Sequence, residues 1–282
     1  MPAGAASNTC YRHADTPTGR RCTRCGKAAC NRCLTKAAVG SHCLDCAKAA
    51  QPDLKTRAKF WSAGQSNLVT MVLIGLNVAV FVAVLLIARS GDALAGQLTS
   101  VHVDFALSKR ALVITDQWYR LVTSGFMHYG IIHIALNMYF LYVLGPLLEP
   151  PLGRARFLLL YMASLLGGSF GVLLLDSGGL TAGASGAVFG LMSGAAVGLW
   201  RRGVNPFSTG IGSTLILNLF LTFFIGGISI GGHLGGAAAG AICATVMLAP
   251  GHKPMPKWAT YAMPVVVGLM SIIGSILIVG AA

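Results

Sequence analysis

The sequence predicts an all-α polytopic membrane protein with a small cysteine-rich module at its N-terminus. Charged residues make up 10% of the 282 residues and hydrophobic residues 55%, whereas a soluble domain needs a charged surface. Seven apolar segments approach the roughly 20 helical residues that cross a bilayer core. Seven of the eight cysteines lie before residue 47. The expected spans are 68–88, 131–148, 157–175, 185–200, 211–229, 231–249 and 260–281.

Residues 1–50 are predicted to form a metal-binding module. Its Cys and His residues fall into four pairs, each separated by two residues: Cys10 and His13, Cys22 and Cys25, Cys30 and Cys33, and Cys43 and Cys46. This spacing is typical of zinc knuckles, and eight ligands suffice for two tetrahedral zinc ions with no open position. We therefore expect structural zinc, with His42 as an alternative ligand to Cys43.

Residues 51–67 form a basic linker, which either rests on anionic lipid headgroups or is simply solvated. The positions of Lys and Arg predict the orientation of the chain in the membrane, because cytosolic loops carry an excess of both residues. With seven spans, 17 of the 21 lie on one side, which predicts a cytosolic N-terminus and an outer C-terminus. The cytosol disfavours disulfides and so favours zinc. The net charge of +13 follows from this topology, so the expected partner is a lipid bilayer and not a nucleic acid.

The segment between the first two spans, about residues 89–130, is expected on the outer side. It mixes apolar and polar residues, and its aromatic content favours a structured loop at headgroup depth over an ordinary exposed loop. These aromatic residues and their methionine neighbour are Trp118, Tyr119, Phe126 and Met127. The loop also carries the four Lys and Arg residues left on this side, which are Arg89, Lys109, Arg110 and Arg120.

Polar residues gather at the expected outer ends of three spans. Ser185 heads the fourth span and His233 heads the sixth. His133 and Asn137 lie four residues apart in the second span and share one helix face. Polar and ionisable groups inside membrane spans are costly, and they mark a functional site by default. The topology was derived without these residues, so their common depth supports a site there.

Glycine spacing predicts that the fourth and sixth spans touch. Glycine recurs every four residues in both, and small residues at this spacing let membrane helices approach closely. This packing should bring Ser185 within hydrogen-bond reach of His233, where histidine can act as general base for a serine nucleophile. No Asp or Glu is expected at that depth, which predicts a Ser–His dyad. The two glycine series are Gly186, Gly190, Gly194 and Gly198, and Gly232, Gly236 and Gly240.

This ordered set resembles the rhomboid family of intramembrane serine proteases over about residues 66–250. The matching elements are Trp118-Tyr119-Arg120, His128, His133-x3-Asn137, Gly145 to Glu149, Gly183-Ala184-Ser185-Gly186, and His233 followed by Gly236 and Gly240. Two positions depart from the family's common pattern: Tyr119 separates Trp118 from Arg120, and Phe189 replaces a frequent tyrosine one turn after the serine. Neither departure removes a catalytic group.

The resemblance implies a rhomboid-like six-helix core at residues 68–250, with one additional transmembrane helix at 251–282. It also implies Ser185 as nucleophile and His233 as general base. His133 and Asn137 would stabilise the oxyanion, together with the backbone N–H of Ser185. Catalysis would need no cofactor. The residues expected to support the site are His128, Phe189, Gly183, Gly186, Gly236 and Gly240.

The even knuckle spacing resembles B-box or RING-like cross-braced modules. On that analogy, one zinc ion would be held by Cys10, His13, Cys30 and Cys33, and the other by Cys22, Cys25, Cys43 and Cys46. We expect a multi-pass protease in a bacterial plasma (inner) membrane that cleaves transmembrane proteins near the outer face. The module would dock a cytosolic protein partner or regulate the protease. The alternative is a non-catalytic membrane protein that binds helices or metal through its zinc knuckles.

Overall fold

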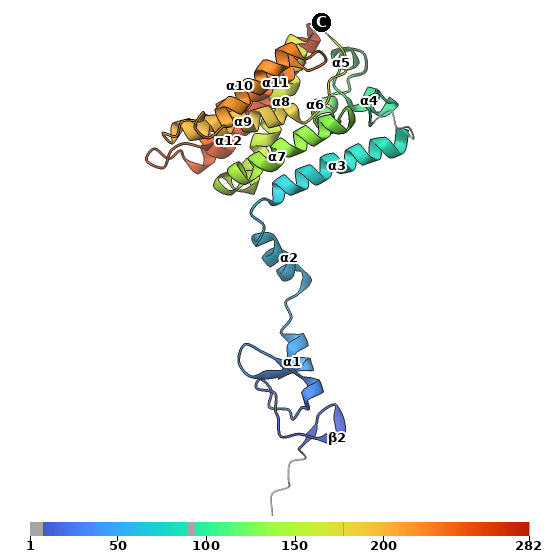
Figure 1. Ribbon diagram of the computed structural model, residues 1–282, viewed down its shortest axis with the longest axis vertical. Coiled ribbons are helices and arrows are strands. Elements are labelled where there is room, and N and C mark those ends of the chain that lie inside the picture. Colours follow the sequence, from blue (N-terminus) through green and yellow to red (C-terminus); the bar gives the residue numbers. More distant parts are fainter. Residues whose placement is uncertain (1–7, 89–93, 177, 282) are drawn as a thin grey trace, which may run out of the picture. The chain divides into compact units, whose positions relative to one another are not determined.

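The computed structural model describes residues 8–88, 94–176 and 178–281. It divides the chain into two compact units, Met1–Gln65 and Ser66–Ala282, which are treated separately below (Figure 1). Arg89, assigned above to the outer loop, lies outside the described residues.

The first unit contains little regular structure. Strand β1 (Thr9–Cys10) pairs antiparallel with β2 (His13–Pro17), and β3 (Leu34–Lys36) pairs with β4 (Ser41–Cys43). A 3-10 turn, η1 (Asn31–Cys33), and a short helix, α1 (Leu44–Ala49), complete the fold. The buried cluster at its centre consists of three cysteines and one alanine. So little apolar burial makes such a segment depend on metal for its stability.

Part of the basic linker is a helix, α2 (Leu54–Ala63), which the sequence did not predict. The side chain of Asp53 accepts a hydrogen bond from the backbone N–H of Thr56 at 3.0 Å, an N-cap that favours helix initiation. Phe60 and Trp61 are exposed on α2. Their exposure is consistent with a linker that rests on lipid.

All seven expected spans are helices in the second unit. Five of them are long and apolar enough to cross a membrane: α3 (Leu68–Ala88), α7 (Gly130–Leu152), α8 (Arg154–Leu175), α11 (Ile230–Met247) and α12 (Lys257–Gly280). The other two, α9 (Ser185–Arg201) and α10 (Ile211–Phe224), are shorter. Helix α10 ends five residues before the predicted boundary at 229, in a turn where Gly227 has φ of +84°.

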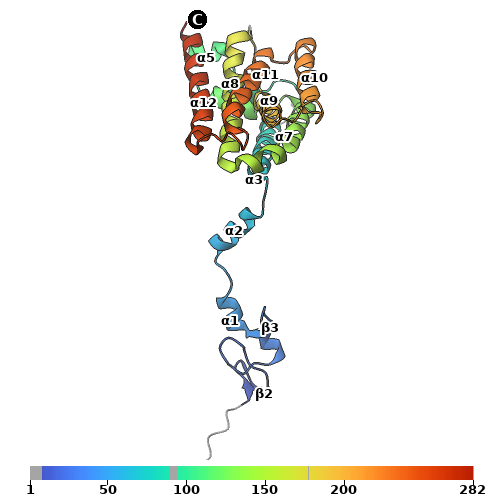
Figure 2. The same cartoon turned by 90° about the vertical axis from the view of Figure 1, so that its left-hand side faces the viewer.

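Helix α9 lies at the centre of the second unit. Every residue from Gly186 to Ala195 is buried, which explains how a short helix is shielded along its length. Figure 2 shows α9 nearly end-on, with α7, α8, α10 and α11 around it and α12 beyond α8. The nucleophile candidate Ser185 is thus the first residue of the most enclosed helix.

The glycine series place α9 and α11 in backbone contact, as their spacing predicted. A Cβ atom at Gly236 would overlap the carbonyl oxygen of Gly186, and one at Gly240 would overlap that of Gly190. A third series on α8 was not anticipated: a Cβ at Gly171 would overlap the carbonyl oxygen of Gly231. Helices α8, α9 and α11 therefore form a core held together by main-chain contacts.

Glu149 joins the end of α7 to the start of α3. Its buried carboxylate accepts hydrogen bonds from the backbone N–H groups of Val69 and Thr70 at 2.9 and 2.8 Å, and from the Thr70 hydroxyl at 2.7 Å. These N–H groups belong to the first turn of α3, where helices lack internal partners and favour negative charge. The carboxylate thus caps α3 from a helix about 80 residues away in the chain.

The segment between α3 and α7 is structured, as predicted. It contains α4 (Ser100–Phe105), α5 (Lys109–Thr115), α6 (Arg120–Thr123) and the 3-10 turn η3 (Ser124–Phe126). The buried guanidinium of Arg120 donates to the carbonyl oxygens of Val103 and Ala106 at 2.7 and 2.6 Å, and to the Gln117 side chain. Arg120 thereby fixes the loop, while the loop's membrane depth stays a prediction.

Candidate active site and metal clusters

Ser185 begins α9 and is held by the residues just before it. The backbone N–H of Gly183 donates to the carbonyl of Ser124 at 2.9 Å, and that of Ala184 donates to Nε2 of His128 at 3.4 Å. Gly183 has φ of +130°, a backbone conformation that few residues other than glycine adopt. Ser185 also lines a cavity of about 30 Å³, which has room for one or two water molecules.

His233 lies in the first turn of α11 and is buried. Its ring stacks on Phe189, with 4.0 Å between ring centroids and 22° between ring planes. Its Nδ1 lies 2.7 Å from Oγ1 of Thr222. Because Phe189 is one turn after Ser185 on α9, the stack keeps the imidazole beside the turn that carries the serine.

The described residues contain no hydrogen bond between Ser185 and His233, although the sequence led us to expect that contact. The imidazole is held instead by the aromatic ring of Phe189 and by Thr222. Hydrogen bonds between catalytic groups often form fully only when substrate binds, so the observed geometry is compatible with the expected roles.

The N-terminus of α11 is fixed by two residues that the sequence analysis did not assign to the site. The Ser229 hydroxyl accepts from the backbone N–H of Gly232 at 2.8 Å and donates to the Asp176 carboxylate at 2.5 Å. Asp176 also accepts from the N–H of Gly231 at 2.9 Å. A serine before an apolar helix is a readable N-cap signal, but no local pattern pairs it with an aspartate 53 residues earlier.

His133 lies against the segment that carries Ser185. Its Nδ1 accepts from the backbone N–H of Tyr129 at 3.3 Å, so the neutral ring carries its proton on Nε2. A Cβ at Gly183 would lie 2.7 Å from this Nε2 and 3.6 Å from Oγ of Ser185. The N–H donor of His133 and the serine hydroxyl thus flank the same glycine.

Asn137 and His128 have other contacts. The buried Asn137 amide donates to the carbonyl of His133 at 2.9 Å, which leaves one of its two N–H donors for another acceptor.

Burial and the neighbouring His133 lower the pKa of His128 to about 3, so its ring is neutral near pH 7. A neutral ring can accept at Nε2 from Ala184 while its Nδ1 donates to the carbonyl of Phe126 at 3.3 Å.

Two further residues near the site, His102 and Tyr129, were not predicted from the sequence. The buried His102 lies with Nε2 3.1 Å from the carbonyl oxygen of His128, and its ring stacks on Tyr129 at 5.0 Å. The Tyr129 hydroxyl donates to the carbonyl of Leu180 at 3.0 Å. These bonds connect α4, the start of α7 and the segment before Ser185. A lone histidine in an aperiodic loop gives no sequence signal for such a role.

The first unit brings its Cys and His ligands into two sets. In each set the ligand atoms lie within 4.8 Å of one another, and the grouping is the cross-braced one that the resemblance implied. Cys43 belongs to one of the two sets, and His42 belongs to neither. The two sets are Cys10, His13, Cys30 and Cys33, and Cys22, Cys25, Cys43 and Cys46.

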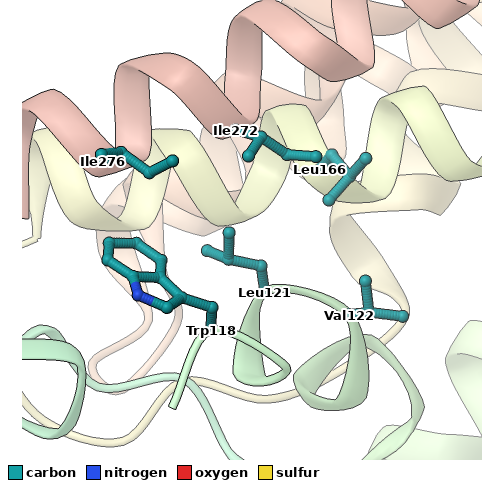
Figure 3. Close-up of a pocket in the computed structure, with 6 residues that line it drawn as sticks. All are labelled: Trp118, Leu121, Val122, Leu166, Ile272 and Ile276. Carbon is teal, nitrogen blue, oxygen red and sulfur yellow. The ribbon is translucent and has the colours of Figure 1, made fainter. Parts of the chain in front are cut away.

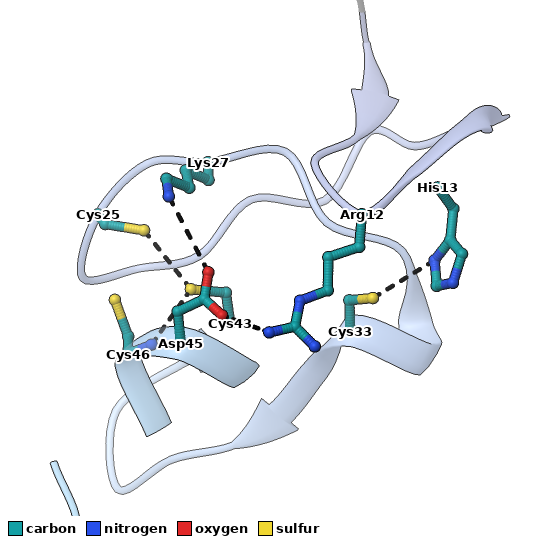
Figure 4. A network of polar contacts seen from close by, with 8 residues as sticks. All are labelled: Arg12, His13, Cys25, Lys27, Cys33, Cys43, Asp45 and Cys46. Carbon is teal, nitrogen blue, oxygen red and sulfur yellow. Dashed lines mark hydrogen bonds and ion pairs between the residues drawn. The ribbon is translucent and has the colours of Figure 1, made fainter. Parts of the chain in front are cut away.

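The distances within each set fit a tetrahedral ion. Nδ1 of His13 lies 3.4 Å from the sulfurs of both Cys30 and Cys33, and the sulfurs of Cys25 and Cys43 lie 3.7 Å apart. Ligands about 2.3 Å from a tetrahedral zinc ion are separated by roughly 3.7 Å. Figure 4 shows members of both sets on either side of Arg12 and Asp45. The donor types and spacing therefore fit zinc.

Backbone hydrogen bonds favour the thiolate form that zinc requires. Burial alone raises the pKa of the Cys10 thiol, but hydrogen bonds with the backbone of Cys30 and Arg12 and with His13 outweigh it and lower the pKa to about 5. Cys22 behaves alike, with burial opposed by backbone hydrogen bonds from Cys43 and Cys25 and a pKa of about 6. Metal-bound cysteine is a thiolate, and the backbone favours this form at Cys10 and Cys22, whereas burial and the neighbouring Cys10 and Cys30 raise the pKa of Cys33 to about 11.

A larger cavity lies apart from Ser185 and His233. Its volume is about 320 Å³, and it lies between α8, α12 and the segment around α6 (Figure 3). All six lining side chains are mainly apolar, and none is a nucleophile or a base. The lining residues are Trp118, Leu121, Val122, Leu166, Ile272 and Ile276.

Comparison with known proteins matches the same region. A family model described as "Rhomboid domain" matches residues 115–250. "Rhomboid protease GluP" of Bacillus subtilis is 32% identical over 155 residues, which cover 54% of this chain and 30% of that protein. "RHOMBOID-like protein 4" of Arabidopsis thaliana is 32% identical over 152 residues, which cover 52% and 38%. "Rhomboid-type serine protease 2" of Emericella nidulans is 31% identical over 147 residues, which cover 48% and 28%.

The chain thus spans about a third of the length of these curated relatives. The matched region includes α7 to α11 and hence Ser185, His233, His133 and Asn137. Together with the five apolar helices, the match identifies a multi-pass membrane protein.

Proposed function

Residues 115–250 are a rhomboid domain, and from that premise we propose that the chain is an intramembrane serine protease. It hydrolyses peptide bonds in or near the transmembrane segments of other membrane proteins. The observation that carries this proposal is the stack of His233 on Phe189, one helical turn from Ser185. This stack supports a base and a nucleophile at the adjoining N-terminal ends of two helices in backbone contact.

The proposed reaction is acyl transfer through a Ser185–His233 dyad. Nε2 of His233 takes the proton of the Ser185 hydroxyl as Oγ bonds to the scissile carbonyl carbon. The C–N bond then breaks, and His233 returns the proton to the leaving amine. Water, activated by the same histidine, hydrolyses the acyl-serine and restores both residues. The cavity of about 30 Å³ beside Ser185 offers room for such a water molecule.

The oxyanion formed at the carbonyl carbon needs donors aimed at it. We assign this role to the Nε2–H of His133, the backbone N–H of Ser185 and the remaining N–H of Asn137. The tautomer of His133, fixed by the bond from Tyr129, supports the first assignment. His128, Gly183, Gly186, Gly236 and Gly240 act as supports that shape the backbone around the dyad. No cofactor enters the reaction.

We propose that the dyad end of the helices faces the outer side, so that cleavage occurs near the outer face. The support is the distribution of Lys and Arg, which puts the N-terminus in the cytosol and the C-terminus outside. The relatives come from a bacterium, a plant and a fungus, so they do not select one membrane. A bacterial plasma membrane is the location that the sequence led us to expect.

For the N-terminal module, we propose two structural zinc ions and a role in docking a cytosolic partner or regulating the protease. Geometry and thiolate-favouring hydrogen bonds support the metal. We retain the boundaries 1–50 for the module, 51–67 for the linker, 68–250 for the catalytic core and 251–282 for the additional helix.

Cleavage of a model transmembrane substrate by the purified full chain in lipid vesicles tests the proposal. Ser185→Ala and His233→Ala should each abolish cleavage, because the first removes the nucleophile and the second removes the base. Ser193→Ala is the matched control: this buried serine lies two turns further along α9 and donates to the carbonyls of Gly190 and Ala237. Equal cleavage by Ser185→Ala and the parent would refute Ser185 as the nucleophile, whereas no cleavage by the parent would favour a non-catalytic, helix-binding or metal-binding protein.

A further inference from the structure

The tautomer of His233 is set by a hydroxyl on a neighbouring helix. Thr222 lies on α10, is buried, and places Oγ1 2.7 Å from Nδ1 of His233. The same Oγ1 lies 2.8 Å from the carbonyl oxygen of Asn218, one turn earlier on α10. Two short contacts therefore meet at one hydroxyl.

A threonine hydroxyl has one proton to donate, and a carbonyl oxygen can only accept. The contact with Asn218 therefore uses the Thr222 proton, because two oxygens 2.8 Å apart without a proton between them would repel. Nδ1 of His233 must then donate to the lone pair of Thr222. The resulting chain runs from Nδ1–H of His233 to Thr222 and from the Thr222 hydroxyl to the carbonyl of Asn218.

In this tautomer Nε2 carries a lone pair and no proton, which is the form that a general base requires. Serine hydrolases usually obtain it from a carboxylate that accepts a hydrogen bond from Nδ1–H. Here the nearby carboxylate of Asp176 accepts from Ser229 and Gly231, and Glu149 accepts from the start of α3. Among the described residues, neither carboxylate forms a hydrogen bond or ion pair with His233.

We infer that Thr222 is the positioning residue for the general base: it accepts a hydrogen bond from the Nδ1–H of His233 and so keeps Nε2 free to take the proton of Ser185. This inference rests on the proposed protease function. Phe189 fixes the plane of the ring from one side, and Thr222 fixes its rotation and tautomer. The orienting group is thus neutral and lies outside the helices that carry the dyad.

Two substitutions separate the hydroxyl from the volume of the side chain. Thr222→Val removes the hydroxyl at nearly constant shape, and Thr222→Ser keeps it. Thr222→Ala serves as a second hydroxyl-free variant should the valine not fold. Ser271→Ala on α12 is the matched control, because Ser271 is buried and donates to the carbonyl of Val267 in the same i−4 pattern.

The first readout is the tautomer of His233, measured by nitrogen NMR on histidine-labelled full chain in lipid vesicles. The signal is assigned by its loss in His233→Ala, and the measurement is made in the Ser185→Ala background so that it needs no activity. The parent and Thr222→Ser should show the Nδ1–H form. The hydroxyl-free variants should show a substantial population of the Nε2–H form.

The second readout is cleavage kinetics. Loss of the hydrogen bond should lower kcat about tenfold to a hundredfold, with KM unchanged because Thr222 contacts the base and not the substrate. Thr222→Ser should restore kcat. An unchanged tautomer with unchanged kcat in both hydroxyl-free variants overturns the inference, while loss of cleavage in Ser185→Ala still upholds the protease. Cleavage that survives in Ser185→Ala refutes the proposed Ser185–His233 protease and leaves the tautomer result to stand alone.

Discussion

Asp176 accepts a hydrogen bond from the hydroxyl of Ser229, the residue that caps α11 four positions before His233. The carboxylate also accepts a hydrogen bond from the backbone N–H of Gly231, so it anchors the first turn of α11, which carries the histidine. Negative charge at this position is favoured because the N–H groups of the first turn lack helical partners. The start of α11 is therefore tied to the end of α8.

Replacing Asp176 should loosen this end of α11. We expect Asp176→Ala to lower the free energy of unfolding by about 1–3 kcal/mol, because Ser229 and Gly231 lose a charged acceptor. Thermal unfolding of the purified chain measures the effect. Asp104→Ala, at an exposed carboxylate, is the control and should change little. Equal stability of the two variants would show that the Asp176 contact does not hold the helix.

The glycines between α9 and α11 should tolerate no side chain. Gly236→Ala and Gly240→Ala should each destabilise the protein by about 1–3 kcal/mol or prevent folding, because the added methyl overlaps a carbonyl oxygen of α9. Gly226→Ala is the control, since a Cβ there meets no atom within 4 Å. Yield and unfolding temperature report the difference, and a fully stable Gly240→Ala variant would contradict the close packing.

The full-length chain should purify with two zinc ions, as measured by elemental analysis. Cys33→Ser and Cys43→Ser should each lose about one ion, because they belong to different ligand sets. His42→Ala should retain both ions, since this histidine lies outside the sets. A metal content near zero in the parent, or loss of an ion in His42→Ala alone, would argue against the ligand assignment.

His128 should make the protein less stable in mild acid. Burial, with a contribution from His133, lowers its folded-state pKa from 6.5 to about 3. Between these two pH values the unfolded chain binds a proton at His128 and the folded chain does not. The stability contributed is complete above pH 6.5 and declines as the pH falls from 6.5 toward 3. His128→Gln should flatten this decline in a pH series of unfolding measurements. His252→Gln, at an exposed histidine, should leave the decline unchanged.

Local sequence patterns predicted the parts of the site that lie on single helices. The four-residue glycine series placed α9 against α11, and Ser185 and His233 each head one of these helices. The contacts that orient them could not be predicted from the sequence, because Thr222 and Asp176 bond to residues of other helices. A single hydroxyl or carboxylate also produces no periodic pattern. The predicted extent of the fifth span was wrong at its end, since Ile225 to Ser229 are apolar enough to continue a span but include two glycines that end α10.

The main-chain contacts among α8, α9 and α11 also affect how tolerance to substitution should be read. At Gly171, Gly236 and Gly240 no side chain fits, because an added Cβ would overlap a backbone carbonyl oxygen of a neighbouring helix. A saturation screen scored by activity would therefore rank these glycines beside Ser185 as equally intolerant. Only a parallel screen scored by abundance in the membrane would separate the two groups, because loss of the serine leaves a folded chain and loss of a glycine does not.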